Sequence, residues 1–434
     1  LWLGWFFLRL AAVFGPFRMQ EVLFFIPLFL SCVLAVFGFF VARRLGANEL
    51  GAFVASVAIN VSPILISRSL VEWFDTDIYN VLLPLLSFGT FLYAFDAASK
   101  LRRGALTALA GLFLAFYAST WKGWWFIFDV MLISGALFIL NQRECGREEG
   151  FDAHRSEGPW RALVSFFLFT TVFVIGINGF VVWNDFIAEP LRLWHILRVT
   201  PGTMWPNVFW TVAELGSGSG AEIVRSVGGS LIFFGSMVGL LYLFIFEKRL
   251  RDPKRGFGFF CLVLWIGSTF YASLEALRFT LLLVVPLGLA YGLVVGRLQV
   301  FLSDLAGRFL KKSWALIARS AVVLVLSIQI VTTVWTAHAM ARSVSPTMND
   351  DWYLLLKKIK TRTSPDARIN SWWDFGHWFK GVADRRVLFD GMTQNTPYAY
   401  WMARVLLTDN EEEALGLLRM INGSGSAVAD ILTR

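Results

Sequence analysis

Long apolar segments separated by short polar turns fill the chain up to about residue 340. A helix needs roughly 20 mostly apolar residues to cross the hydrocarbon core of a bilayer. Segments that meet or approach this length lie at 20–42, 47–67, 78–98, 103–119, 121–141, 160–182, 226–246, 257–274, 277–296 and 315–338. The pattern predicts a polytopic α-helical membrane protein, with a multi-spanning domain over residues 1–340.

Basic residues are concentrated in every second loop between these segments. The basic loops contain Arg43 and Arg44; Lys100, Arg102 and Arg103; Arg143, Arg147, Arg155 and Arg161; Lys248, Arg249, Arg251, Lys254 and Arg255; and Arg297, Arg308, Lys311 and Lys312. Cytoplasmic loops of membrane proteins carry an excess of Lys and Arg. The alternation therefore predicts that 68–77, 183–225, 275–278 and the chain after about 340 lie on the outer face of a plasma or inner cell membrane.

The chain after residue 340 changes character. Aromatic, charged and turn-forming residues are mixed there, and 341–434 is predicted as the start of a soluble outer domain of mixed α/β type. Within it, 409–420 is predicted as an amphipathic helix with Asp409 as its candidate N-cap. The chain begins with Leu1 inside an apolar run and ends at Arg434, so we interpret it as a fragment of a longer protein.

Composition and charge support a membrane protein. Hydrophobic residues make up 56% of the chain and charged residues only 16%, whereas soluble domains carry about 25% charged residues. The formal net charge of +8 fits loops that face anionic lipid. No long basic stretch is interleaved with polar residues, so a nucleic-acid partner is not expected. Cys32, Cys145 and Cys261 have neither metal nor disulfide spacing.

Two carboxylates lie at the predicted outer end of a span. Asp75 and Asp77 are separated by one residue, and Arg68 precedes them in the same outer loop. Carboxylates at this spacing can converge on one cation, and oxygen ligands select Mg²⁺, Mn²⁺ or Ca²⁺. The alternative is a solvated loop in which Asp75 caps the next helix, and the D-x-D pattern alone favours that alternative.

Two further charged residues fall on the predicted outer face. Glu214 ends the sequence TVAE at 211–214, in the long loop 183–225. Taken alone, a solvated Glu is the simpler interpretation. Arg278 opens the span 277–296, where an Arg can extend to the lipid headgroups or donate two hydrogen bonds to a phosphate.

The soluble segment contains the sequence WWDFGH at 372–377. It can form a pocket with two indole N–H donors, from Trp372 and Trp373, and one carboxylate acceptor, from Asp374. Such a pocket can hold a small hydroxyl group, and its buried donors would reject an analogue that lacks the hydroxyl. The alternative is a turn in a hydrophobic core.

These four motifs, in this order, resemble the catalytic subunit of oligosaccharyltransferase, the membrane enzyme of asparagine-linked glycosylation. WWDFG looks like the WWDYG signature of that family, with Phe375 in place of Tyr. Asp75 and Asp77 look like its second acidic motif, and TVAE looks like its outer-loop motif with a metal-binding Glu. The segment around Arg278 looks like the one whose Arg meets the lipid pyrophosphate. The resemblance covers essentially the whole chain and implies a GT-C-type glycosyltransferase of the single-subunit archaeal or bacterial kind.

The resemblance implies a function and a role for each motif. A glycan is transferred, with inversion, from a lipid-pyrophosphate donor to the Asn side chain of N-x-Ser/Thr segments in acceptor proteins. The charged residues implied in catalysis are Asp75, Asp77 and Glu214, which would hold Mn²⁺ or Mg²⁺, Arg68, which would support the carboxylates, and Arg278, which would neutralise the pyrophosphate. Trp372, Trp373 and Asp374 would bind the Ser or Thr hydroxyl. The full set implied in substrate binding is Trp372, Trp373, Asp374, Phe375, Gly376, His377 and Arg278.

The chain departs from the family pattern in three places. His377 stands where the family often has Tyr. Residues 1–20 contain no Asp, so the first acidic motif of the family is expected in sequence that precedes Leu1. The second hydroxyl-pocket motif is not identifiable. The chain also carries its own N-x-Ser sequence at 422–424, which is either an acceptor site or, more simply, a glycine-rich turn.

Three other functions remain open from the residues. A glycosyltransferase that uses a polyprenyl-phosphate sugar and a different acceptor shares the membrane architecture, but it has no obvious use for a hydroxyl pocket. A transporter would place charged residues or broken helices at the bilayer midplane, whereas most ionisable residues here lie at span ends. A structural membrane subunit with degenerate motifs is the third alternative.

Overall fold

The computed structural model describes most of the chain in two compact units. The described residues are 7–9, 12–13, 15, 19–70, 75–95, 97, 99–149, 157–198, 212, 215–246, 253–309, 321, 331–345, 347–393, 397–425, 427 and 431. One unit combines Leu1–His195 with Gly218–Val344, and the other combines Ile196–Ser217 with Ser345–Arg434.

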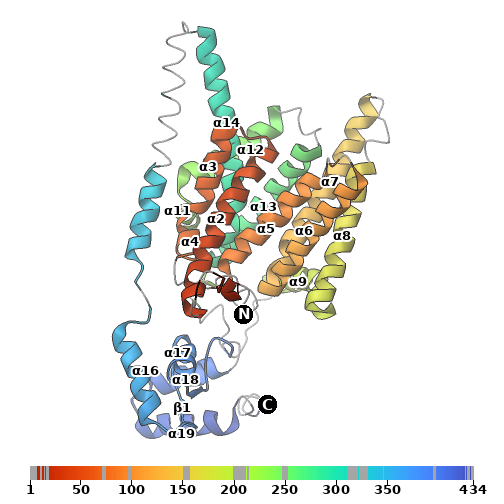
Figure 1. The fold of residues 1–434 in the computed structure, drawn as a ribbon. Coiled ribbons are helices and arrows are strands. Elements are labelled where there is room, and N and C mark those ends of the chain that lie inside the picture. The colour runs from red at the N-terminus through yellow and green to blue at the C-terminus, as the bar shows by residue number, and fades with distance from the viewer. Residues whose placement is uncertain are drawn as a thin grey trace. The chain divides into compact units, whose positions relative to one another are not determined.

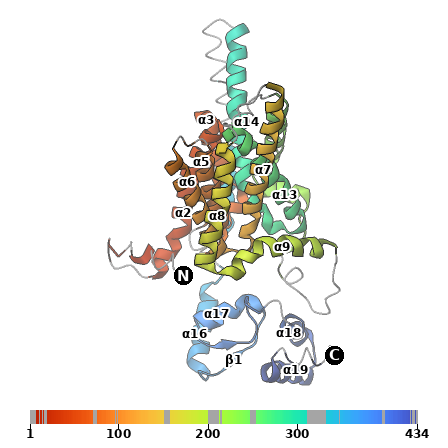
Figure 2. The same ribbon diagram turned by 90° about the vertical axis from the view of Figure 1, so that its right-hand side faces the viewer.

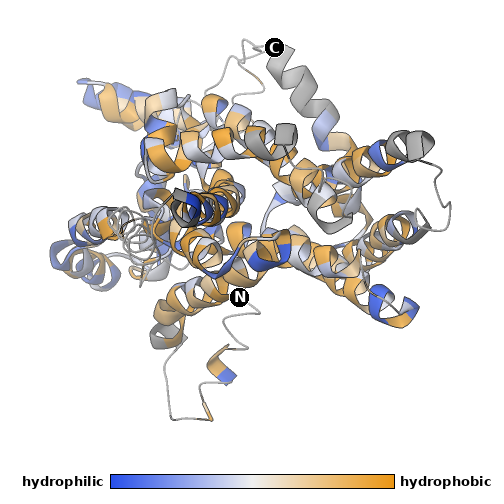
Figure 3. Cartoon of the chain, turned by 90° about the horizontal axis from the view of Figure 1, so that it is seen from above, coloured by the Kyte–Doolittle hydropathy of each residue, from blue (hydrophilic) through white to orange (hydrophobic). Residues whose placement is uncertain are grey.

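Helices form the first unit (Figures 1 and 2). Up to residue 309 they are α2 (Met19–Leu45), α3 (Glu49–Asn60), α4 (Pro63–Ile66), α5 (Asp77–Ala94), α6 (Lys100–Thr120), η1 (Lys122–Trp124), α7 (Trp125–Glu149), α8 (Glu157–Asn178), α9 (Phe180–Arg198), α11 (Gly220–Ser226), α12 (Ser230–Phe246), α13 (Pro253–Glu275), η5 (Leu277–Phe279) and α14 (Thr280–Phe309). Hydrophobic residues prevail along these helices (Figure 3). The most buried of the long apolar helices are α5 and α14.

Seven of the described helical segments are long and apolar enough to cross a membrane. They are Val22–Leu45, Asp77–Ala94, Lys100–Thr120, Lys122–Gln142, Pro159–Asn178, Gly256–Glu275 and Leu277–Leu305. Each overlaps a span predicted from the sequence, so the polytopic helical fold is confirmed. The predicted span 315–338 falls largely on 310–320 and 322–330, which lie outside the described residues.

The prediction of a single span over 47–67 is wrong. The helix α3 ends at Asn60 after 12 residues, and the short helix α4 begins at Pro63. Proline has no amide hydrogen and disfavours a helical backbone at the residue before it. Pro63 therefore interrupts an apolar run that is otherwise long enough to cross, and α3 on its own is shorter than a membrane span.

The predicted span 226–246 is also bent. The helices α11 and α12 meet at an angle of 96°, and between them Gly228 and Gly229 have φ of +105° and +100°. Only glycine adopts such backbone angles without strain. The chain therefore turns sharply here, and the apolar run does not continue as one straight helix.

Gly229→Ala is expected to destabilise the protein by about 1–3 kcal/mol, the usual cost of a strained backbone position. An added Cβ at Gly229 would meet no atom within 4 Å, so the backbone angle alone carries the penalty. Gly267→Ala on α13 is the matched control, because it also adds a methyl group to open space but on a helical backbone, where alanine stabilises by about 0.5–1 kcal/mol. Thermal unfolding midpoints in detergent test this, and equal midpoints for the two variants would contradict it.

The helices α3 and α14 approach each other through glycines. A Cβ on Gly51 would lie 2.4 Å from the carbonyl oxygen of Gly292, and a Cβ on Gly292 would lie 2.3 Å from that of Gly51. The side chain of Asn48 joins the same two helices, because its Nδ2 donates to the carbonyl of Gly296 at 3.1 Å and its Oδ1 accepts from the N–H of Gly51 at 2.8 Å. Backbone-to-backbone contact of this kind is possible only where side chains are absent.

The second unit is mainly helical, with a small parallel sheet (Figure 2). Its described elements are α16 (Asp350–Arg362), β1 (Arg368–Ile369), η6 (Trp373–Phe375), α17 (Gly376–Gly381), β2 (Arg386–Val387), α18 (Tyr398–Leu407) and α19 (Glu411–Ser424). The strands β1 and β2 pair in parallel, with Arg368 opposite Arg386 and Ile369 opposite Val387. The turn η6 and the helix α17 lie in sequence between these two strands and carry WWDFG.

The helix predicted at 409–420 exists as α19, with two corrections. Its N-cap is Asn410 and not Asp409, because Oδ1 of Asn410 accepts the N–H groups of Glu412 and Glu413 at 2.9 and 3.2 Å. The sequence at 422–424 is the last turn of this helix and not a glycine-rich turn. There Asn422 Nδ2 donates to Oδ1 of Asn370 at 3.0 Å and to the carbonyl of Leu418 at 2.9 Å.

Candidate active site

The acidic motif lies where α5 begins. Asp77 is the first residue of α5 and Thr76 is its N-cap, so Asp75 does not cap this helix. Asp75 is exposed, and its Oδ1 accepts the N–H of Thr76 at 2.6 Å. One carboxylate of the motif therefore faces solvent, and the next starts a helix that is largely buried.

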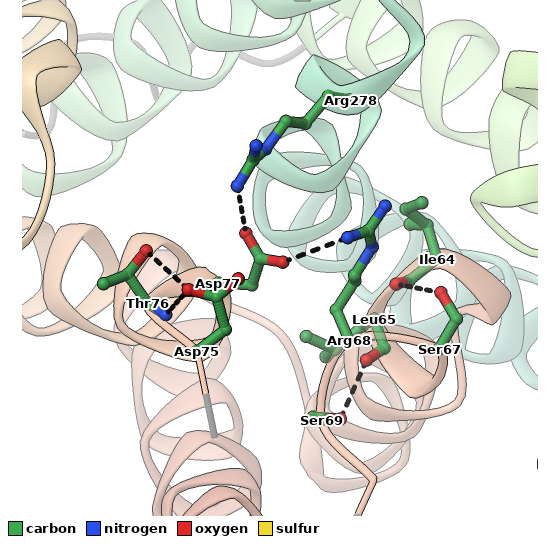
Figure 4. A network of polar contacts seen from close by, with 9 residues as sticks. All are labelled: Ile64, Leu65, Ser67, Arg68, Ser69, Asp75, Thr76, Asp77 and Arg278. Carbon is green, nitrogen blue, oxygen red and sulfur yellow. Dashed lines mark hydrogen bonds and ion pairs between the residues drawn. The ribbon is translucent and has the colours of Figure 1, made fainter. Parts of the chain in front are cut away.

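Asp77 is held between two arginines from distant parts of the chain (Figure 4). Its Oδ2 lies 3.6 Å from Nη1 of Arg68, and its Oδ1 lies 3.4 Å from Nη2 of Arg278. The Asp77 side chain is 1% exposed, that of Arg68 14% and that of Arg278 40%. A buried carboxylate requires such partners. The exposed part of Arg278 leaves room for it to contact a ligand as well.

Short polar turns hold the two arginines in place. The hydroxyl of Ser67 donates to the carbonyl of Ile64 at 3.0 Å, and that of Ser69 donates to Leu65 at 2.8 Å, so both serines fix the turn that carries Arg68 (Figure 4). Pro63 prevents α3 from continuing and begins the short helix α4, which leads into this turn. The helix break that the apolar pattern did not predict is thus what places Arg68 beside the start of α5.

The second arginine is carried by the one-turn helix η5. The loop that precedes α11 packs on this turn, because Gly218 donates its N–H to the carbonyl of Leu274 at 3.2 Å. A Cβ on Gly218 would lie 2.9 Å from the carbonyl oxygen of Ser273 and 3.0 Å from Leu277. The ring of Phe279 lies 6.4 Å from that of Trp121. The turn that presents Arg278 is therefore braced on two sides.

The carboxylates of this site suit a hard cation. Among the described residues, Asp77 Oδ2 is buried and accepts no hydrogen bond, although it faces Arg68. Asp75 adds a second, exposed carboxylate. Carboxylate oxygens select Mg²⁺ or Mn²⁺. Within the described part of the chain no three acidic, His or Cys residues are close enough to hold a metal, and Glu214, predicted as the third ligand, lies outside that part.

One polar residue near Asp77 was not among the site residues predicted from the sequence. Asn80 follows Asp77 by three residues, on the same face of α5, and it is 6% exposed. Its Oδ1 is buried and accepts no hydrogen bond from the described residues. The spacing of three residues after an acidic motif, inside an otherwise apolar span, is a signal from which Asn80 could have been found.

In the second unit, the indoles of WWDFG pack on a hydrophobic core. Trp372 and Trp373 both contact a cluster centred on the buried Phe389, and the rings of Trp372 and Phe389 lie 5.4 Å apart, edge to face. Phe375 stacks on Trp352 at 5.0 Å. The two indoles thus contribute to the core, and the hydroxyl pocket stays a prediction. Trp373 Nε1 is nevertheless buried without a hydrogen-bond acceptor among the described residues.

The polar residues of the motif face outward. Asp374 and His377 are exposed. The surrounding side chains partly desolvate Asp374 and so raise its pKa, an effect that hydrogen bonds from its own backbone and from the Trp372 side chain oppose. The motif thus contains, at successive positions, a buried N–H without an acceptor among the described residues and an exposed carboxylate. A hydroxyl can pair with groups of both kinds, because it both donates and accepts a hydrogen bond.

Two charged residues that pack behind the motif were not among the site residues predicted from the sequence. Lys380 on α17 forms an ion pair with the buried Asp390. Burial acts to raise the pKa of Asp390, but hydrogen bonds from Lys380 and the N–H of Met392, together with the charges of Lys380 and His377, bring it below its ordinary value. A single Asp in an apolar segment after β2 was the available signal.

Comparison with known protein families gives two matches. Residues 1–341 match the family described as "Oligosaccharyl transferase STT3, N-terminal", and residues 365–424 match the "STT3/PglB/AglB core domain". The first match alone covers more than three quarters of the 434 residues. The four sequence motifs fall inside these two ranges.

Curated relatives agree with these matches. A dolichyl-phosphooligosaccharide-protein glycotransferase of Methanococcus voltae is 25% identical, over 94% of this chain and 54% of the relative. The enzyme of that name from Methanocaldococcus jannaschii is 27% identical, over 73% of this chain and 41% of the relative. An undecaprenyl-diphosphooligosaccharide–protein glycotransferase of Campylobacter jejuni is 22% identical, over 87% and 54%. The chain thus spans about half the length of the curated relatives it matches.

A solved structure has the same fold. The archaeal oligosaccharyltransferase AglB of Archaeoglobus fulgidus, in complex with an inhibitory peptide and a dolichol-phosphate, superposes with a TM-score of 0.73 at 17% identity, over 97% of this chain and 60% of that one. The predicted GT-C-type helical architecture is therefore confirmed. With the family matches, this means that the chain belongs to the STT3 family of oligosaccharyl transferases.

Proposed function

We propose that this chain carries the catalytic site for transfer of an oligosaccharide from a lipid-pyrophosphate donor to the Asn side chain of N-x-Ser/Thr segments in acceptor proteins. The observation that supports this most directly is the buried Asp77 between Arg68 and Arg278. The relatives from Methanococcus voltae and Campylobacter jejuni are named as glycotransferases that use dolichyl and undecaprenyl carriers. The part-exposed guanidinium of Arg278 suits a donor that carries phosphate groups.

Arg278 is the proposed contact for the pyrophosphate. Its guanidinium is part-exposed and already oriented by Asp77, and arginine binds phosphate oxygens through two parallel hydrogen bonds. As the bond between the sugar and the pyrophosphate breaks, negative charge grows on the leaving group. A preorganised cation at that position lowers the energy of the transition state. Arg68 is more buried and is proposed to orient Asp77.

Asp75, Asp77 and Glu214 are the proposed ligands of Mn²⁺ or Mg²⁺. This set rests on the family resemblance of the two motifs, and carboxylate oxygens are the ligands that these ions prefer. The bound ion would orient the acceptor amide and stabilise developing charge. The carboxylates would accept hydrogen bonds from the amide N–H groups and hold the nitrogen opposite the departing pyrophosphate. The nitrogen bonds to the anomeric carbon as the bond from that carbon to the pyrophosphate breaks, and one amide proton passes to a carboxylate. Attack from that side inverts the anomeric centre.

The second unit is proposed to recognise the acceptor. Trp373 Nε1 is a buried donor with no acceptor among the described residues, and Asp374 is an exposed acceptor next to it in sequence. The hydroxyl of Ser or Thr, two residues after the acceptor Asn, can satisfy both. Trp372, Phe375, Gly376 and His377 shape the same turn. The alternating basic loops favour an outer-face position for this unit, which stays part of the proposal.

The full-length protein, purified in detergent, tests this function directly. A lipid-linked oligosaccharide extract and a fluorescent Asn-x-Thr peptide are incubated with Mn²⁺, beside an Asn→Gln peptide and a Glu214→Gln enzyme. The proposal expects a gel shift of the Asn peptide alone, lost on addition of EDTA and strongly reduced in Glu214→Gln. Transfer of sugar to another acceptor, with the Asn peptide unmodified, would support the alternative glycosyltransferase and overturn this proposal.

A further inference from the structure

The segment 388–393 lies directly behind the WWDFG turn. Phe389 is 1% exposed, and its ring contacts that of Trp372 edge to face at 5.4 Å. Ala399 and Met402 of α18 complete the same core. This segment follows β2, whereas the WWDFG turn follows β1, and the two strands pair side by side. The sheet therefore brings the two segments to the same edge.

Gly376 is in contact with the backbone of that segment. A Cβ on Gly376 would lie 2.5 Å from Cβ of Asp390, 2.8 Å from the carbonyl oxygen of Phe389 and 3.0 Å from Cα of Asp390. The first residue of α17 thus has no space for a side chain. Any displacement of residues 389–390 is transmitted to Gly376 and so to the indoles and carboxylate immediately before it.

Hydrogen bonds and an ion pair of Asp390 stabilise this contact. Its Oδ1 accepts the N–H of Met392 at 2.9 Å, and its own N–H donates to the hydroxyl of Thr393 at 2.9 Å. Its Oδ2 pairs with Nζ of Lys380. Lys380 follows Gly376 by four residues, on the same face of α17. The ion pair therefore ties the helix that starts at Gly376 to the segment on which Gly376 rests.

We propose that Asp390 is a positioning residue for the acceptor pocket. With Lys380 it clamps α17 onto residues 388–393 and so sets the place of Trp372, Trp373 and Asp374. This inference rests on the proposed function, in which those three side chains bind the Ser or Thr hydroxyl of the acceptor. Neither Asp390 nor Lys380 touches the acceptor, so their effect is on the pocket geometry.

The effect is expected in acceptor binding and not in the chemical step. A pocket that holds a group remote from the reacting nitrogen contributes mainly uniform binding, whose loss raises KM and leaves kcat little changed. Loss of one hydrogen bond to a charged group weakens binding by about tenfold or more. Asp390→Asn keeps the shape of the side chain and one acceptor for Met392 but removes the charge that holds Lys380.

The structure offers a matched control pair in the same unit. Lys360 and Asp384 also form an ion pair, and both Lys360 and Lys380 are 48% exposed. The carboxylates differ, because Asp384 is 73% exposed and Asp390 only 3%. Asp384→Asn and Lys360→Gln therefore make the same chemical changes as Asp390→Asn and Lys380→Gln, away from the WWDFG turn.

The experiment measures KM and kcat for an Asn-x-Thr peptide, and KM for the lipid-linked donor, in the full-length enzyme. Asp390→Asn and Lys380→Gln are each expected to raise the peptide KM about tenfold, with kcat and donor KM within about twofold of wild type. Lys380→Arg is expected to restore the peptide KM. The two control variants are expected to behave as wild type.

Equilibrium binding of two peptides separates positioning from general destabilisation. The preference for Asn-x-Thr over Asn-x-Ala measures the hydroxyl contact alone, and it is expected to shrink in Asp390→Asn, even where the thermal midpoint is unchanged. Wild-type preference and wild-type peptide KM in both Asp390→Asn and Lys380→Gln would overturn the inference. Absence of Asn transfer by the wild-type enzyme would instead count against the proposed function on which it rests.

Discussion

Asp77→Asn is expected to reduce the rate of glycan transfer by about a hundredfold or more, the size of effect seen when one preorganised charged contact is removed from an active site. The side chain keeps its size but loses the negative charge shared by Arg68 and Arg278. Two guanidiniums then face a neutral amide, and their mutual repulsion moves Arg278 from the position proposed for the pyrophosphate. A proposed metal ligand is lost at the same time.

The measurement is the initial rate of peptide glycosylation at saturating donor and acceptor, with the Mn²⁺ concentration varied. Asp304→Asn makes the same chemical change at an exposed position on α14, near the helix end that is remote from Arg278. This variant is expected to keep the wild-type rate. A rate for Asp77→Asn within threefold of wild type, in protein that elutes as a single folded species, would show that this carboxylate takes no part in the reaction.

Gly292→Leu is expected to have the largest effect on stability. A Cβ at this position would lie 2.3 Å from the carbonyl oxygen of Gly51, 2.5 Å from Cβ of Ala55 and 3.0 Å from its Cα. Two of these atoms belong to the backbone of α3, which cannot swing aside as a side chain can. Overpacking usually costs about 1–3 kcal/mol and sometimes more, and here it separates α3 from the buried helix α14. We expect about 3 kcal/mol or more.

Gly176→Leu provides the comparison, because Gly176 on α8 has no atom within 4 Å of an added Cβ. Size-exclusion profiles and thermal unfolding midpoints in one detergent report on both variants. The contact explanation requires aggregation or a strongly lowered midpoint for Gly292→Leu only. Similar midpoints for the two variants would mean that α3 and α14 can separate without cost.

The sequence predicted the long spans well because their signal is simple. Apolar length reports what fits into a bilayer, and that property does not depend on neighbouring helices. Apolar length alone does not show where a helix inside an apolar run is interrupted. Pro63 and the pair Gly228 and Gly229 are single-residue features inside apolar runs, and they divide what looked like continuous spans. The N-cap of α19 was misplaced by one residue, since Asp409 and Asn410 are both good caps and only the hydrogen bonds distinguish them.

The sequence named Asp77, Arg68 and Arg278, which the structure brings together, but it did not predict their geometry. Asp75 and Asp77 were chosen for their spacing on the predicted outer face, and Arg278 was chosen as a possible phosphate contact there. The ion pairs of Asp77 with two arginines could not be predicted from the sequence, because they depend on how α4, α5 and η5 pack together. Lys380 and Asp390 were missed for a similar reason. Each looks like an ordinary surface charge until the sheet brings the segments after β1 and β2 together.

The folded position of Asn422 has a consequence for the protein as its own potential substrate. Both hydrogens of its amide are committed, one to Asn370 and one to Leu418, inside the last turn of α19. Nucleophilic attack needs an amide nitrogen that can be withdrawn from its surroundings and presented on an extended segment. Under the proposed function, the folded segment 422–424 would therefore be protected from self-modification. A newly made chain, before α19 has formed, would be open to it, so the order of folding and glycan transfer would decide whether Asn422 carries a glycan.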